Sequence, residues 1–244
     1  FYPFEKVFKE TKNHEKIIEN IDIGGPTLVR AAAKNYNDTV VITNKNQYKE
    51  FINELNQNKG STTIDFRKKL SEEAFSFTSQ YDALISTYLS EKNKNDFPKK
   101  KIIHANLLEN LRYGENPHQN AAIYGVESDL GIFQLHGKKL SYNNYNDIFA
   151  ALNISKTLPK NTGAVIIKHA NPCGVSITKN KLNSYKEAYA CDPISAFGGI
   201  VLLNFKVTKN LAIELNKLFL EVIIGNGFDN HSLKILRKKK IWDL

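Results

Sequence analysis

The pattern of hydrophobic and polar positions changes after about the first hundred residues. In the first part, apolar residues recur mainly at helical spacing, as on the shared face of Tyr48, Phe51, Ile52 and Leu55. This pattern predicts helices at 26–35 and 45–56, one or two helices over 63–89, and a single strand at 39–43. Residues 7–20 are polar and have only sparse apolar positions.

In the second part, helical and strand-like patterns alternate. Strands are predicted at 121–124, 164–168, 199–204 and 221–225, and helices at 147–158, 181–190, 207–220 and 231–239. The strands at 164–168 and 199–204 are short apolar runs, which is typical of strands buried on both faces. Repeated alternation predicts an α/β fold whose sheets are covered by helices on both sides.

A charged, Asn-rich and Pro-containing stretch at 91–101 is the best candidate for a linker. It predicts a division into domains at 1–90 and 102–244. No run approaches the roughly 18 apolar residues that a membrane span requires. No signal peptide is visible, and the two cysteines lack CxxC spacing, so a reducing, cytoplasmic setting is expected. Because the sequence begins at Phe1 and contains no Met, we expect an internal fragment.

The formal net charge is +9. Nucleic-acid binding is one interpretation of this excess. A Lys/Asn/Ile-rich composition is the other, and it is favoured because the lysines are spread along the chain and Arg, the better reader of bases, is scarce. The same charge would attract a phosphorylated, polyanionic substrate.

Lys168 and His169 are the most informative residues for chemistry. They follow a predicted buried strand directly and precede an Asn171-Pro-Cys-Gly sequence that predicts a sharp turn. A Lys side chain can stabilise developing negative charge and a His side chain can move a proton. A packed, hydrogen-bonded His is the more common outcome at a strand end, but an adjacent Lys favours a catalytic site.

Three further loops concentrate glycine, charge and aromatic residues. The first spans 21–26 and ends in Gly24-Gly25-Pro26, with Lys34 on the helix that follows. The second, 111–119, contains Arg112, which can clamp an anion, and Tyr113, which can stack on a flat ring. The third, 191–199, has Asp-Pro at one end and Gly-Gly at the other, so a ligand could reach its backbone amides.

Together these loops resemble, in the same order, those of the bifunctional purine-biosynthesis enzymes that combine phosphoribosylaminoimidazolecarboxamide (AICAR) formyltransferase with inosine monophosphate (IMP) cyclohydrolase. The matching stretches are 2–4, 21–26 with 30–35, 111–119, 140–144, 168–175 and 191–199. One departure is 223–228, where the family often has an Ala-Pro-Gly turn; Asn226 tolerates turn geometry there.

The resemblance implies the end of a methylglyoxal-synthase-like domain, followed by a cytidine-deaminase-like α/β subdomain of the transformylase, truncated here. The family's opening segment, with its phosphate-binding loops, and most of the second transferase subdomain are expected to lie outside this sequence. The fragment by itself is therefore not expected to be a complete enzyme. The resemblance also implies a homodimer for the full-length protein, no required metal, and neither a nucleic acid nor a membrane as partner.

For formyl transfer, the resemblance implies 10-formyltetrahydrofolate as co-substrate and AICAR as acceptor. His169 then acts as general base and Lys168 stabilises charge. The implied substrate-binding residues are Arg112, Tyr113, Asn171, Gly198 and Glu221.

For the following ring closure of FAICAR to IMP, the resemblance implies Tyr2, Asp22 and Lys34 as catalytic residues. Asp22 and Lys34 lie on either side of Gly24-Gly25, so a folded-back pair is expected to form easily.

Two other classes of protein remain open. The residues from His169 to Cys173 faintly echo a zinc nucleoside deaminase, but no Glu follows His169, and no Cys follows Cys173, at the required spacing. A non-enzymatic RNA-binding module would also use the positive charge, but basic residues interleaved with aromatics on one face would be expected.

Overall fold

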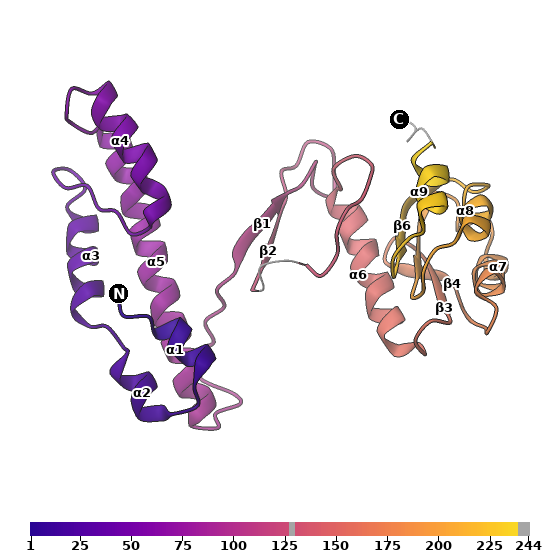
Figure 1. Ribbon diagram of the computed structural model, residues 1–244, viewed down its shortest axis with the longest axis horizontal. Coiled ribbons are helices and arrows are strands. Elements are labelled where there is room, and N and C mark those ends of the chain that lie inside the picture. Colours follow the sequence, from indigo (N-terminus) through magenta and orange to yellow (C-terminus); the bar gives the residue numbers. More distant parts are fainter. Residues whose placement is uncertain (127–129, 239–244) are drawn as a thin grey trace. The chain divides into compact units, whose positions relative to one another are not determined.

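The structure is a computed structural model and describes residues 1–126 and 130–238. It divides into two compact units, Phe1–His104 and Ala105–Leu244 (Figure 1). The predicted linker at 91–101 falls at the end of the first unit, where the last long helix stops at Lys92 and the chain becomes irregular.

The first unit is built from helices. They are α1 (Phe4–Glu10), α2 (His14–Glu19), α3 (Gly24–Lys34), the short 3-10 helix η1 (Lys45–Gln47), α4 (Tyr48–Gln57) and α5 (Ile64–Lys92). The helices predicted at 26–35, 45–56 and 63–89 are confirmed, and the last is one continuous helix. It begins where the Thr63 side chain accepts a hydrogen bond from the Phe66 amide, a normal N-cap.

The strand predicted at 39–43 is wrong. These residues form no ladder in the described part of the chain. Val41 is instead buried in a small apolar cluster with Ala33 of α3 and Ala74 of α5. Helices therefore bury the apolar side chains that suggested a strand, and the backbone needs no strand partner to do so.

The second unit contains two sheets. Strands β1 (Asn106–Asn110) and β2 (Ala122–Gly125) form an antiparallel pair. The larger sheet has the order β4-β3-β5-β6, made of β3 (Gly163–Lys168), β4 (Asn171–Ile177), β5 (Gly199–Leu203) and β6 (Leu220–Gly225). Strand β3 is antiparallel to both neighbours, whereas β5 and β6 are parallel. The helices are α6 (Tyr142–Thr157), α7 (Lys181–Cys191), α8 (Lys209–Leu215) and α9 (Asn230–Arg237).

Helices cover both faces of the larger sheet, as the pattern predicted. Ala164 and Ile166 of β3 face the core cluster that includes Tyr185 of α7. Val165, whose side chain alternates to the other face, packs with Ala151 of α6. Full burial of side chains such as Ile166 stabilises the fold by about 1.5–3 kcal/mol each.

Several boundaries in this unit differ from the predictions. Strands β1 and β4 were not predicted. Helix α6 starts at Tyr142 rather than at 147, because Ser141 and Asn144 form a capping box in front of it. The helix predicted at 207–220 is confined to α8, since Leu220 pairs with Gly199 in the parallel ladder. The helix predicted at 231–239 is α9, and position 239 lies outside the described residues.

Among the described residues, no helix is long and apolar enough to cross a membrane.

Candidate active site

Lys168 and His169 lie at a tight hairpin between β3 and β4. Lys168 pairs with Asn171, and the two residues between them, His169 and Ala170, have φ of 54° and 59°. Two positive φ values at the centre of a two-residue hairpin are typical of a type I′ turn, which normally prefers Asn or Gly. The turn predicted at Asn171-Pro-Cys-Gly is therefore wrong: it forms two residues earlier, and Asn171 begins β4.

The sheet topology brings three distant segments to one end of the sheet. Because β3 runs antiparallel to β5 and β5 runs parallel to β6, the end of β3 lies beside the starts of β5 and β6. The Lys168 Nζ atom donates a hydrogen bond to the Phe197 carbonyl at 2.8 Å. A Cβ atom added to Gly198, which has φ of +73°, would lie 3.9 Å from that same Nζ atom. The fold thus brings Lys168 and Gly198 together.

Helix α6 connects Glu221 and the hairpin. The Asn144 side chain donates from Nδ2 to Glu221 Oε2 at 2.6 Å. Three residues further along α6, Asp147 Oδ1 accepts a hydrogen bond from the Ala170 amide at 2.6 Å. Residues three apart lie on the same side of a helix, so one side of α6 binds both β6 and the hairpin between β3 and β4. Neither contact is predicted by the sequence, in which Asp147 is only the first residue of a predicted helix.

Arg112 and Tyr113 form a local pair next to α6. The Arg112 guanidinium carbon lies 4.7 Å from the Tyr113 ring centroid, and Nη2 donates to the Tyr113 hydroxyl at 3.0 Å. Backbone hydrogen bonds join Arg112 to Leu140 and Tyr113 to Tyr142, so the loop is fixed against the entry to α6. The pair is therefore held by structure around it, rather than being a loose surface loop.

A groove of about 1250 Å³ is lined by Arg112, Tyr113, Asn144 and Glu221, together with apolar side chains such as Phe133. Of the described residues, Lys168, His169, Asn171 and Gly198 do not line this groove. The predicted substrate-binding residues therefore fall into two neighbouring sets, one at the groove and one at the hairpin, which α6 joins through Asn144 and Asp147.

Burial and hydrogen bonding control the titratable groups around the site. Burial, and then the hydrogen bond from its hydroxyl to Glu109 Oε2 at 2.5 Å, raise the pKa of Tyr145 well above its usual range. Burial likewise raises the pKa of the Cys173 thiol, and the negative charge of Asp192 raises it further. A raised pKa disfavours the thiolate, which is the nucleophilic form of the side chain.

No group of three or more His, Cys, Asp and Glu side chains within residues 1–126 and 130–238 could hold a metal ion.

In the first unit, Asp22 is held at the start of α3. Its Oδ1 atom accepts from the Gly25 amide at 2.7 Å, and its own amide donates to the Tyr81 hydroxyl at 2.7 Å. Its Oδ2 atom accepts from the Tyr2 amide at 3.1 Å, while the Tyr2 side chain is 61% exposed. Tyr2 and Asp22 are thus close, but through the Tyr2 backbone rather than its phenol.

Lys34 lies at the opposite end of α3, and this corrects the expected folded-back pair. Gly24 and Gly25 are the first residues of the helix and do not reverse the chain. With a rise of 1.5 Å per residue, the 11 residues of α3 separate the Asp22 end from Lys34 by roughly 15 Å. The structure therefore does not join Asp22 and Lys34 directly.

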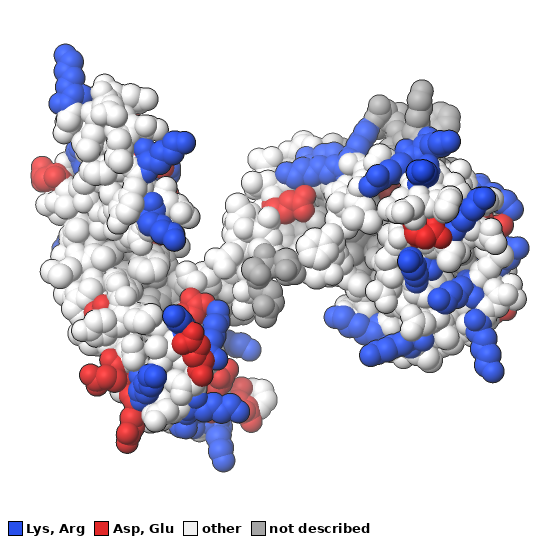
Figure 2. Space-filling model, viewed as in Figure 1, with Lys and Arg blue, Asp and Glu red and all other residues white. Residues whose placement is uncertain are grey.

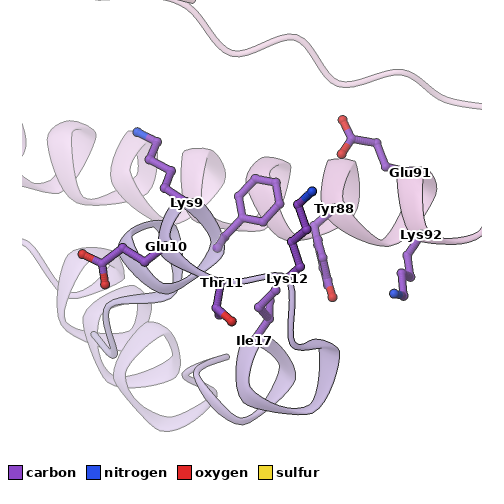
Figure 3. Close-up of a pocket in the computed structure, with 9 residues that line it drawn as sticks. Lys9, Glu10, Thr11, Lys12, Ile17, Tyr88, Glu91 and Lys92 are labelled. Atoms are coloured by element: carbon purple, nitrogen blue, oxygen red, sulfur yellow. The ribbon is translucent and has the colours of Figure 1, made fainter.

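A second, smaller cavity of about 500 Å³ opens in the first unit between α1, the turn after it and the end of α5 (Figure 3). Lys9, Lys12 and Lys92 line it together with Glu10 and Glu91, so it carries charges of both signs. None of the predicted site residues lies there.

Comparisons with known proteins agree with the resemblance. A family model described as AICARFT/IMPCHase bienzyme matches residues 32–244. The chain belongs to this family of two-activity enzymes.

Among its relatives, the bifunctional purine biosynthesis protein PurH of Thermoanaerobacter sp. is 46% identical over 98% of this chain and 48% of the relative. The PurH proteins of Acetivibrio thermocellus and Bradyrhizobium diazoefficiens are 44% and 43% identical over 98% of this chain, and over 48% and 46% of their own lengths. The chain spans about half the length of the curated relatives it matches.

Proposed function

We propose that this chain is part of a bifunctional enzyme of purine biosynthesis. One reaction transfers a formyl group from 10-formyltetrahydrofolate to the 5-amino group of AICAR, giving FAICAR. The other closes the ring of FAICAR with loss of water, giving IMP. Family membership and the PurH relatives support this proposal, as do the two separate units of the chain.

The observation that supports formyl transfer most strongly is the convergence of Lys168, the 197–198 loop and Glu221 at one end of the sheet. These segments are far apart in the sequence, and each brings a different chemical group. The hairpin adds His169 beside Lys168 on a strained backbone, and strained residues cluster at functional sites.

In this proposal His169 is the general base. The 5-amino group of AICAR is a weak nucleophile because its lone pair is delocalised into the imidazole and the carboxamide. Removal of its proton by the imidazole would make attack on the formyl carbon feasible. The side chain of His169 is exposed, so a substrate can reach it.

Lys168 stabilises the negative charge that develops on the formyl oxygen. Its ammonium group has three N–H donors. One of them is bound to the Phe197 carbonyl, which fixes the position of Nζ and leaves two donors for a substrate oxygen. A fixed donor stabilises a transition state better than one that must first be oriented.

Arg112, Tyr113 and Glu221 are proposed to bind the ribotide, with Asn171 and Gly198 close to the reacting atoms. The groove that contains the first three is large enough for a nucleotide-sized ligand. The guanidinium is suited to the phosphate and the aromatic ring to the flat base. Lysines and arginines are prominent over the visible face of this unit, which suits a phosphorylated substrate (Figure 2).

Ring closure is proposed to use Tyr2, Asp22 and Lys34 of the first unit. The reaction is intramolecular, so proximity supplies much of its rate. Because α3 separates Asp22 from Lys34, we propose that they act through separate contacts with the substrate rather than as a bonded pair.

The finer assignments are also proposals. Residues 1–90 would belong to the methylglyoxal-synthase-like cyclohydrolase domain and 102–244 to the first cytidine-deaminase-like subdomain of the transformylase. The full-length protein would be a cytoplasmic homodimer that needs no metal.

The test uses the full-length protein and measures both reactions separately. Lys168→Ala and His169→Ala should abolish formyl transfer and spare ring closure, whereas Asp22→Ala and Lys34→Ala should do the reverse. Lys179→Ala, which removes an exposed lysine from the turn after β4, is the matched control and should affect neither. Loss of both reactions in a folded protein, or of neither, would exclude the assignment.

A further inference from the structure

A single peptide group in the hairpin is held from both ends by side chains. The peptide between His169 and Ala170 contributes the His169 carbonyl and the Ala170 amide. The carbonyl accepts a hydrogen bond from Asn171 Nδ2 at 2.8 Å. The amide donates to Asp147 Oδ1 at 2.6 Å. Rotation of this peptide plane would break both hydrogen bonds.

The backbone at this position needs such support. His169 and Ala170 both have positive φ, a region that Ala in particular rarely adopts. Rotation of the central peptide would convert a type I′ turn to the related II′ form, which has positive φ only at its first central residue. Ala170 would then have a negative φ, which is favourable for Ala. A turn with these residues persists only where its surroundings determine it.

Asp147 is well placed to provide this support because α6 is fixed. Two buried residues of this helix near Asp147, namely Ile148 and Ala151, are 2% and 0% exposed. The capping box of Ser141 and Asn144 fixes its first turn. The carboxylate of Asp147 therefore has a defined position relative to β3. Lys168 is the last residue of this strand, and His169 follows it directly.

We propose that Asp147 is a positioning residue for His169: together with Asn171 it locks the His169–Ala170 peptide and so fixes the direction of the imidazole. This inference rests on the proposed role of His169 in formyl transfer. It also gives Asn171 a structural role, because its side-chain amide already donates a hydrogen bond to the His169 carbonyl. Asp147 acts through the backbone and need not touch the substrate.

The test measures formyl transfer by the full-length protein, with ring closure as an internal control. Asp147→Ala should lower kcat for formyl transfer by about 10- to 100-fold, the effect expected of a misplaced catalytic group, with little change in KM for AICAR. Asp147→Asn keeps an oxygen that can accept from the Ala170 amide, so its kcat should stay within a few-fold of the parent. Asn146→Ala, a change at the neighbouring exposed position, is the matched control and should have no effect.

A second variant separates positioning from direct chemistry. Ala170→Gly removes the penalty for positive φ, so the turn should persist without the carboxylate. Introduced into Asp147→Ala, it should restore most of the lost kcat. An Asp147→Asn variant as impaired as Asp147→Ala, or a failure of Ala170→Gly to restore activity, would overturn the proposal.

Hydrogen exchange distinguishes this proposal from the proposed function. The Ala170 amide should exchange faster in Asp147→Ala than in the parent, while the amides of β3 remain protected. If exchange is unchanged, Asp147 does not hold the His169–Ala170 peptide. If exchange accelerates but His169→Ala retains formyl transfer, Asp147 does hold the peptide and the proposed role of His169 is wrong.

Discussion

The two candidate sites are built in opposite ways. In the second unit, Lys168, Gly198 and Glu221 come together from the ends of three strands, and helix α6 binds Glu221 and the Ala170 amide of the hairpin. In the first unit, Asp22 and Lys34 lie at opposite ends of a single helix. The ends of neighbouring strands lie close together at one end of a sheet, whereas two residues on one helix move 1.5 Å further apart along its axis with every position between them. A long separation in the sequence is therefore compatible with contact in the second unit, but it produces distance along α3 in the first.

The contacts that support each site differ accordingly. The hydrogen bond between Asn144 and Glu221 joins residues 77 positions apart. Asp22 instead accepts from the Gly25 amide, only three positions away, and its bonds to Tyr81 and Tyr2 are long-range. The second site should depend on the tertiary fold of its unit, and the first on one local turn and its aromatic neighbour.

The largest expected effect is that of Gly174→Ala. A Cβ atom at this position in β4 would lie 1.9 Å from the Ala188 carbonyl oxygen of α7, and backbone cannot yield as a side chain can. We expect destabilisation of the second unit by about 3 kcal/mol or more, with loss of formyl transfer. Hydrogen exchange of β3 and β5 amides measures the effect, while the helices of the first unit should keep their protection.

Ser176→Ala is the control for this prediction. It lies two residues further along the same strand and loses only an exposed hydrogen bond to Glu187. It should cost less than about 1 kcal/mol. A mild Gly174→Ala variant would mean that the close contact of β4 with α7 does not support the site.

The second effect concerns the first unit. A Cβ atom on Gly25 would lie 2.6 Å from Asp22 Oδ2, so Gly25→Ala should displace the carboxylate that binds the Gly25 amide in the first turn of α3. We expect a loss of about 1–2 kcal/mol, the usual value of a side-chain hydrogen bond to a backbone amide at a helix start, and impaired ring closure with formyl transfer intact. Protection of α3 amides from exchange and both activities are measured.

Gly24→Ala is the matched control, because a Cβ atom there would meet nothing within 4 Å. Equal effects of the two substitutions would show that the position of Asp22 is not what matters in this turn.

These comparisons explain what the sequence could and could not predict. The apolar runs at 164–168 and 199–204 predicted buried strands because burial on both faces leaves an unmistakable pattern. Strand β4 was missed because its Asn-Pro-Cys-Gly start reads as a turn. Gly174 is needed because α7 packs so closely on β4 that there is no room for a side chain. This need arises from tertiary packing and leaves no local pattern in the sequence.

Candidate residues were accessible to sequence reasoning only where a motif displayed them. Lys168, His169 and Arg112 stood in conspicuous loops, whereas Asn144 and Asp147 look like ordinary polar positions of a helix. Their partners lie on other elements, at Glu221 and Ala170, so no local pattern could reveal them. The folded-back pair of Asp22 and Lys34 was wrong for the converse reason: a Gly-Gly-Pro sequence suits the first turn of a helix as well as a reversal.

The third effect compares coupling in the two sites by double-mutant cycles. Asn144→Ala and Glu221→Ala, which remove directly bonded partners, should show a coupling free energy of about 0.5–3 kcal/mol. Asp22→Ala and Lys34→Ala, roughly 15 Å apart, should be additive within about 0.5 kcal/mol. Stability is measured by hydrogen exchange within each unit. Strong coupling between Asp22 and Lys34 would contradict the extended arrangement along α3.

The smallest effect is an acid titration in the loop that precedes Gly198. Hydrogen bonds from the Ser195 side chain and amide hold the pKa of Asp192 below its usual range. A carboxyl group with a lowered pKa stabilises the fold above its unfolded pKa, about 3.9, and this contribution disappears as the pH falls through the folded pKa. The Ser195 amide resonance should therefore titrate with a midpoint below pH 3.9, and Asp192→Asn should abolish that titration.

Because Asp192 lies at the surface, protonation of its carboxyl should loosen the 192–198 loop without unfolding the sheet. The β3 amides should therefore stay protected over the same pH range. If the β3 amides lost protection together with the loop, the loop would belong to the cooperative unit of the sheet. The second site would then depend on a local hydrogen bond of a carboxylate, as the first one does.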